Sequence, residues 1–272
     1  MNRFSIALAG LIGVTTSASA ADMSDYAPFN APSEPTIWTG FYAGVSLGGA
    51  HSDGEAERGY YTGEPLTTDV GNGLFPGDID GDEWGVIGGV QVGYNHQFGN
   101  FVAGAEADFS FTDLNILNRY QRIDPSPTFP YTGTDTRTSY STDIENLGTV
   151  RARFGYASGP TLAYVSGGLA YGKVTNKFNL DLTFPLLNGA EYPRDLGGIG
   201  RWSEEDWSAG YAIGGGVEHK FTEAFSLKAE LFYVDLEDTK IKVTDPVFPG
   251  NQIDYHFDND LVIGRIGLNY AF

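Results

Sequence analysis

The last thirteen residues of the sequence, Asp260–Phe272, read D-L-V-I-G-R-I-G-L-N-Y-A-F. Counting back from Phe272 in steps of two gives a set that is apolar apart from one glycine, namely Tyr270, Leu268, Ile266, Gly264 and Val262. The residues between them are small, polar or charged: Ala271, Asn269, Gly267 and Arg265. Because side chains alternate between the two faces of a β-strand, this segment predicts a strand with one apolar and one polar face.

The same separation of apolar and charged positions recurs along the chain. We predict eight strands, at about 38–50, 84–97, 101–111, 145–157, 161–174, 206–220, 226–237 and 260–272. Charges in the middle of these strands fall on one parity each time, as in the pairs Glu106 and Asp108, Arg151 and Arg153, and Lys228 and Glu230. A charge that faces lipid at mid-membrane costs about 2–4 kcal/mol, so the pattern indicates apolar side chains outside and charges inside.

The gaps between the predicted strands alternate between short and long. Three short gaps lie at 98–100, 158–160 and 221–225, and four long gaps lie at roughly 51–83, 112–144, 175–205 and 238–259. Transmembrane barrels show this asymmetry. We therefore predict an all-β fold, an eight-stranded antiparallel transmembrane up-and-down β-barrel with short periplasmic turns and long extracellular loops, formed by residues 38–272.

The N-terminal segment has the features of an export signal. Arg3 gives a positive start, Phe4–Val14 is a short apolar run, and Ala18-Ser19-Ala20 supplies small residues for a signal peptidase. We expect Sec-dependent export with cleavage after Ala20, so that residues 1–20 are a signal peptide. Residues 21–37 contain three prolines and no alternation, which predicts an extended periplasmic tether.

Composition narrows the classes of function. The chain has 272 residues, a formal net charge of -19 and no cysteine. The acidic balance argues against a nucleic-acid partner, and the lack of cysteine excludes disulfides and thiolate metal sites. The 16 tyrosines and 18 phenylalanines fit two aromatic girdles at the membrane interfaces.

The charges predicted to point inward nearly balance. The cations are Arg151, Arg153, Lys220, Lys228 and Arg265, and the carboxylates are Glu106, Asp108, Glu218 and Glu230. A barrel of about eight strands is only wide enough for side chains to fill. Unpaired buried charges are costly, so we expect a lumen packed with ion pairs, in which Arg151 and Arg153 pair with Glu106 and Asp108.

Four strand motifs carry a family resemblance: W-T-G-F-Y-A-G-V (38–45), G-T-V-R-A-R-F-G-Y (148–156), Y-V-S-G-G-L-A-Y-G (164–172) and I-G-L-N-Y-A-F (266–272). With them the chain resembles the alphaproteobacterial small outer-membrane β-barrel proteins of the RopB type, also called surface antigens or "porin family" proteins. The resemblance implies an abundant, surface-exposed outer-membrane barrel that contributes to envelope integrity. It also implies contact with lipid and lipopolysaccharide, and recognition of the strand ending at Phe272 by the barrel-assembly machinery.

One loop contains part of a calcium-binding pattern. In G-D-I-D-G-D-E (77–83), Asp78, Asp80 and Asp82 occupy alternate positions, as at the start of a calcium loop. Glu83 stands where that loop needs glycine, and the twelfth position is glycine instead of glutamate. A solvated acidic loop is therefore favoured, and whether these residues bind a divalent cation that bridges lipopolysaccharide phosphates stays open.

The chain has four histidines that could belong to a Ser-His-acid site of a lipid-modifying enzyme: His51, His96, His219 and His256. None lies in a serine-containing motif, and His96 and His219 fall at strand ends where a ring suits the headgroup level. We therefore expect no enzyme activity, with no catalytic residues, no metal site and no cofactor.

The sequence thus favours a structural, surface-exposed outer-membrane protein. A narrow passive porin for small solutes is one alternative, and a protein that binds a ligand or host surface through its loops is another. A lipid-A-modifying enzyme is the weakest alternative. The sequence leaves open the conductance of the lumen, any ligand and the oligomeric state.

Overall fold

The computed structural model describes residues 37–52, 54–63, 77–124, 134–183, 199–244, 250 and 252–272. The predicted signal peptide and nearly all of the predicted tether lie outside the described residues. The elements are all β-strands: β1 Gly40–Ser52, β2 Glu55–Thr62, β3 Asp78–Asp80, β4 Glu83–Phe98, β5 Phe101–Asp124, β6 Thr134–Ser158, β7 Thr161–Thr183, β8 Ile199–Lys220, β9 Phe225–Thr244 and β10 Gln252–Ala271. No helix in the described part of the chain is long and apolar enough to cross a membrane.

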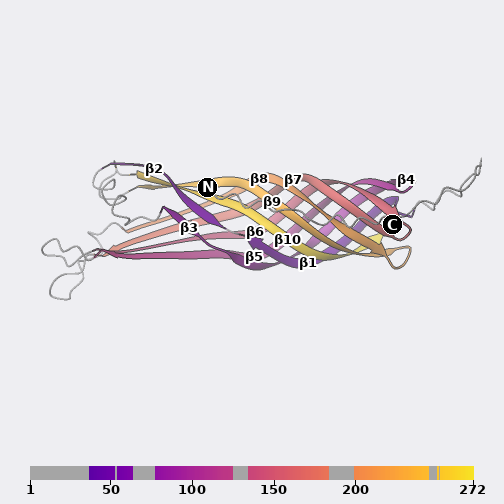
Figure 1. Ribbon diagram of the computed structural model, residues 1–272, viewed down its shortest axis with the longest axis horizontal. Coiled ribbons are helices and arrows are strands. Elements are labelled where there is room, and N and C mark those ends of the chain that lie inside the picture. Colours follow the sequence, from indigo (N-terminus) through magenta and orange to yellow (C-terminus); the bar gives the residue numbers. More distant parts are fainter. Residues whose placement is uncertain are drawn as a thin grey trace, which may run out of the picture. The chain divides into compact units, whose positions relative to one another are not determined.

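Eight of these strands close into a barrel (Figure 1). Neighbours pair antiparallel in the order β1-β4-β5-β6-β7-β8-β9-β10, and β10 returns to pair with β1. The closing ladder runs from Tyr42 opposite Ala271 to His51 opposite Val262. The predicted all-β antiparallel barrel is thereby confirmed, and the last segment of the sequence is the strand that closes it.

The remaining two strands prolong the first hairpin. β1 and β4 pair up to Ser52 opposite Glu83, and β2 and β3 resume with Glu55 opposite Asp80 in the same register. β2 also pairs with the first part of β10, and it thereby prolongs the ladder that β1 forms with the C-terminal part of β10. The prediction of one long loop over 51–83 was therefore wrong in part, because this stretch contains strand at both ends.

Two tight turns connect strands at one end of the barrel, which we call the turn end; the opposite end is the loop end. Gly99 and Gly159 occupy these turns with φ of 61° and 57°, a conformation that favours glycine. Both turns were predicted from the short gaps at 98–100 and 158–160.

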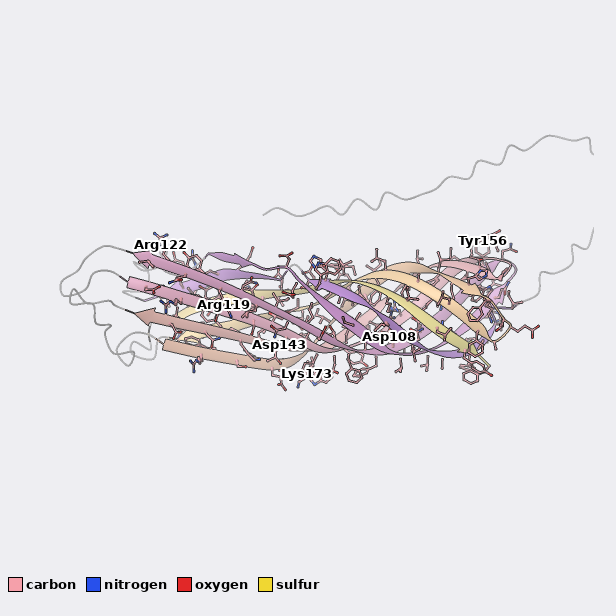
Figure 2. All side chains as sticks on the ribbon, turned by 90° about the horizontal axis from the view of Figure 1, so that it is seen from below. Asp108, Arg119, Arg122, Asp143, Tyr156 and Lys173 are labelled. Atoms are coloured by element: carbon pink, nitrogen blue, oxygen red, sulfur yellow. The ribbon has the colours of Figure 1, made fainter. Side chains whose placement is uncertain are left out.

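The strands are longer than the sequence predicted. β5 runs to Asp124 and β6 begins at Thr134, inside the loop predicted at 112–144. β7, β8, β9 and β10 likewise extend into the predicted loops at 175–205 and 238–259. Figure 2 shows these long strands from the side, with Tyr156 near the turn end, Asp108 in the middle and Arg122 near the loop end. The barrel is therefore longer than the strands predicted from the sequence.

The outer surface has two zones. Nearest the turn end, exposed outward side chains are large and apolar, among them Val45, Leu47, Val90, Leu169, Ile213 and Leu231. Exposed aromatic residues border this zone on both sides: Phe98, Phe101, Tyr156, Phe221, Phe225 and Phe272 at the turns, and Trp84, Phe111, Tyr171 and Trp207 at the other border. This apolar zone with aromatic borders is the surface that a transmembrane barrel presents to lipid, and we call it the apolar belt. Beyond it lie exposed Arg119, Lys177 and Lys240.

The polarity of the buried side chains changes along the barrel in the direction opposite to that of the outer surface. Inside the apolar belt the buried residues include Glu106, Arg151 and Lys228, whereas nearer the loop end they form an apolar cluster that includes Tyr140, Phe178, Ile241, Tyr255 and Phe257. β-bulges adjust the alternation at this change: the β6 register shifts between Ile144 and Asn146, and β9 has one extra residue between Leu236 and Thr239, where its register with β10 shifts. We call the part of the barrel between the apolar belt and the loop end the projecting half. It is built like a water-soluble barrel, with apolar side chains inside and polar ones outside.

A barrel closed by the β1–β10 ladder resists detergent unfolding because its strands are paired on both sides around the ring. Refolded protein kept unboiled should therefore migrate differently from boiled protein in a denaturing detergent gel. Identical migration of the two samples, with refolding verified by circular dichroism, would contradict the closed ring.

The absence of native cysteine allows the projecting half to be mapped. In intact cells, Arg119→Cys should react with a membrane-impermeant maleimide, because its outward side chain lies in water beyond the belt. Val150→Cys should stay unlabelled, because its exposed side chain faces lipid. Protection of Arg119→Cys alongside a denatured control that labels fully would place the membrane boundary elsewhere.

Candidate functional site: the packed lumen

Eight charged side chains meet inside the apolar belt. They come from five strands, and alternation directs each of them inward: Glu106 and Asp108 from β5, Arg151 and Arg153 from β6, Glu218 from β8, Lys228 and Glu230 from β9, and Arg265 from β10. All are buried. We call this set the lumen network.

Arg151 is the centre of the network. Its Nη2 lies 3.0 Å from Glu106 Oε1, 3.3 Å from Asp108 Oδ2 and 3.2 Å from Glu230 Oε1. Its Nε donates to Thr149 Oγ1 at 3.0 Å. The predicted pairing of Arg151 with Glu106 and Asp108 is confirmed, and the contact with Glu230 extends it across the barrel.

Arg153 forms the predicted ion pair with Glu106, but its shorter ion pair is with Glu218, which was not predicted as its partner. Its Nη2 donates to Glu218 at 2.8 Å, whereas its nearest approach to Glu106 is 3.6 Å. Its Nη1 donates to the Tyr42 hydroxyl at 2.8 Å, and its guanidinium lies 4.0 Å from the centre of the Tyr164 ring. The pairing chosen from adjacent strands was therefore only partly right, since Glu218 reaches Arg153 from across the lumen.

The two inward tyrosines, which break the apolar-charged pattern in the sequence, belong to the network. The Tyr42 hydroxyl donates to Glu106 and the Tyr164 hydroxyl donates to Glu230, each at 2.8 Å. A buried hydroxyl that donates to a carboxylate satisfies both groups, so these aromatic residues contribute polar contacts inside the barrel.

Lys228 and Arg265 complete the ion pairs. Lys228 is fully buried, and its Nζ lies 2.8 Å from Glu106 and 3.3 Å from Glu230. Arg265 donates from Nη1 to Asp108 at 2.9 Å and from Nε to Glu230 at 2.5 Å. Four cations thus face four carboxylates, and the network links β5, β6, β8, β9 and β10 at one level.

Lys220 was predicted to be a fifth inward cation, but it lies outside the network. Its Nζ donates to the Glu223 carbonyl at 3.1 Å and sits 5.4 Å from the centre of the Trp38 ring. It is the last residue of β8, where the turn offers a nearer partner than the lumen carboxylates.

Apolar layers lie on both sides of the network. At the turn end, Trp38, Val102, Ala157 and Leu162 form a buried cluster with Tyr164. On the loop side, a larger cluster includes Leu114, Ile116, Leu147, Phe232 and Leu236. The guanidinium of Arg151 lies over the Phe232 ring, with its central carbon 4.5 Å from the ring centre. The lumen is therefore filled in layers.

Trp38 lies inside the barrel and not in the aromatic border at the turns, since only 3% of it is exposed. Its backbone N–H donates to Gln97 and its indole Nε1 donates to the Gly159 carbonyl at 3.2 Å. It precedes β1 and folds over the turn end of the lumen, where a pocket is lined by Trp38, Asn95, Glu218, Lys220 and Ser226.

The acidic segment 77–83 lies partly in a strand. Asp78–Asp80 forms β3, and Asp82 is exposed between β3 and β4. Among the described residues, no three histidine or acidic side chains are grouped closely enough to hold a metal ion. The side chains of Asp78 and Asp80 lie outside the described residues.

The histidines lie apart from one another. His51 stacks on Trp84 with ring centres 4.4 Å apart, and a ring nitrogen lies 3.1 Å from the Glu83 carbonyl. His219 shares a hydrogen bond of 2.9 Å with the Thr161 hydroxyl at the turn end. His96 is exposed near Phe98, as expected for the headgroup level.

A closed antiparallel ring with an apolar belt, aromatic borders and a polar lumen defines a transmembrane β-barrel protein of the outer-membrane class. Residues 6–259 match the family model described as outer membrane protein beta-barrel domain, and the chain belongs to that family. The resemblance that the strand motifs carried is confirmed.

Two relatives share 32% identity with the chain, covering 98% of it and 99% of their own length. Both are called 31 kDa outer-membrane immunogenic protein, one from Brucella melitensis and one from Brucella suis. Among solved structures, the outer membrane protein OprG from Pseudomonas aeruginosa is similar with a TM-score of 0.43 and 13% identity, over 86% of this chain and 96% of that one. The protein is thus an outer-membrane barrel of the surface-antigen type.

The network predicts non-additive mutations. Arg151→Ala should lower the free energy of unfolding by about 3–5 kcal/mol, because it leaves buried carboxylates without their cation. Glu106→Gln should also destabilise, but the double variant should cost less than the sum of the two. Urea unfolding of refolded protein measures all three. Simple additivity would mean that the two residues do not interact.

Proposed function

We propose that this protein is a structural, surface-exposed component of the outer membrane that contributes to envelope integrity. The observation that carries the proposal is the layered lumen, in which balanced ion pairs lie between two apolar clusters. Such an interior ties the strands together and leaves little room for solutes. We further propose that the carboxylates act in these ion pairs and not in catalysis, since each of them contacts at least one buried cation.

The partners follow from the outer surface. The apolar belt suits lipid, and the projecting half with its charged exterior suits the lipopolysaccharide layer and the medium beyond. The loop end would face outside and the turn end the periplasm, after export and cleavage at Ala20. A narrow porin is less well supported, because a solute would have to pass both apolar clusters.

Single-channel recording tests the proposal. Refolded protein inserted in a planar bilayer should show no steady conductance. A variant with Leu114→Ala and Phe232→Ala, which truncates the loop-side cluster, should conduct more than the natural protein if water enters the space. Gel mobility should first confirm that both proteins are folded. Steady, reproducible channels in the natural protein would favour the narrow porin.

Phe272 offers a test of assembly in cells. It is 80% exposed, its N–H donates to the Phe41 carbonyl at 3.0 Å, and its ring packs edge-on against Tyr270. Deleting it should lower the outer-membrane level of the protein while leaving refolding in detergent nearly intact. Phe221→Ala, an exposed aromatic residue at the same border, should leave the level unchanged. Equal levels for the deletion and the natural protein would argue against recognition of Phe272.

A further inference from the structure

β8 and β9 separate at the border between the apolar belt and the projecting half. Their ladder ends where Gly210 lies opposite Leu236. Beyond that point β8 continues as Ile199–Ala209, paired with β7 on its other side, and β9 continues paired with β10. Within the part of the chain that the structure describes, the free side of Ile199–Ala209 has no strand partner. We call this segment the β8 edge.

Two carboxylates show that the wall is open at the β8 edge. Glu204 and Asp206 lie on the lumen-facing side of β8, opposite Asn176 and Val174 of β7, which are both buried. Trp202, on the same side, packs against the barrel interior. Glu204 and Asp206 are nevertheless exposed. Since their neighbours Asn176 and Val174 are buried at the same level, this exposure agrees with a wall that lacks a strand on the other side of β8.

The chain's own β9 is a poor partner for this edge. If the ladder continued past the bulge in β9, Glu204 and Asp206 would share a face with Ile241 and Val243, which are 2% and 4% exposed. Closing the wall would then bury two carboxylates against apolar side chains without a cation. Burial of an unpaired charge is strongly unfavourable, so the edge stays open.

We propose that the β8 edge is a docking site for an extended basic segment of another protein, which adds to the sheet as an antiparallel strand. The free backbone N–H and C=O groups supply the hydrogen bonds for strand addition. Lysine or arginine residues at alternate positions of the partner would meet Glu204 and Asp206. Charge on an exposed edge also keeps neutral strands from pairing with it, which makes the site selective.

The outward face of the edge fits the same partner. Glu205 is already neutralised by Lys173, whose Nζ lies 3.0 Å away. Trp207 is 62% exposed and offers a ring to an apolar or cationic side chain. The partner strand should therefore carry basic residues on the face toward the lumen and apolar residues on its outward face.

A model peptide tests the site. The probe is an acetylated, amidated and fluorescently labelled octapeptide that alternates lysine and valine, added to the refolded full chain in lipid nanodiscs. Binding should be saturable, and hydrogen exchange should slow within residues 199–209. Replacing the lysines by glutamate, or methylating alternate backbone nitrogens, should weaken binding by about tenfold or more. Equal affinity of the methylated peptide would overturn strand addition.

Variants separate a specific site from general attraction to an acidic protein. Glu204→Gln with Asp206→Asn should weaken binding by about tenfold. Glu57→Gln with Asp254→Asn removes the same charge from another part of the projecting half and should leave binding unchanged. Equal weakening by the two pairs would overturn the proposal. So would a dimer of the natural protein, seen by sedimentation, that dissociates on neutralising Glu204 and Asp206, because a second copy would then occupy the edge.

Discussion

Within a membrane, a sheet must pair all its backbone N–H and C=O groups internally, and the rest of this structure depends on that constraint. It requires the β1–β10 ladder that closes the ring. Closure creates an inside and an outside, and alternation then sends half of every strand into a narrow lumen. Charges on that half must find partners there, which explains why four cations and four carboxylates form one network.

The constraint relaxes where the barrel leaves the lipid. Water surrounds the projecting half, so its outer face becomes polar and its interior is stabilised by apolar burial. Bulges in β6 and β9 shift the alternation between the two zones. Outside the membrane, water can form hydrogen bonds with the backbone N–H and C=O groups of a strand edge. The wall can therefore open there, as it does between β8 and β9.

The two halves therefore suit different tasks. The membrane half, held by Arg151 and its partners between apolar layers, fits a rigid structural role. The projecting half has a charged exterior and, within the described residues, a strand edge without a strand partner that carries two exposed carboxylates. A stable membrane half would allow this exposed part to vary without loss of the fold.

The sequence by itself determined the class of fold, the turns at Gly99 and Gly159, and the inward direction of the lumen charges, because alternation is a local property of a strand. Only the tertiary structure decided the length of the strands. Beyond the membrane the apolar side chains face inward and the polar ones outward, so the pattern expected of lipid-facing strands does not continue there. The tertiary structure also decided that Arg153 binds Glu218, that Trp38 covers the lumen, and that β9 separates from β8 beyond Gly210. These features depend on contacts between strands far apart in sequence, whose positions are fixed only when the ring closes.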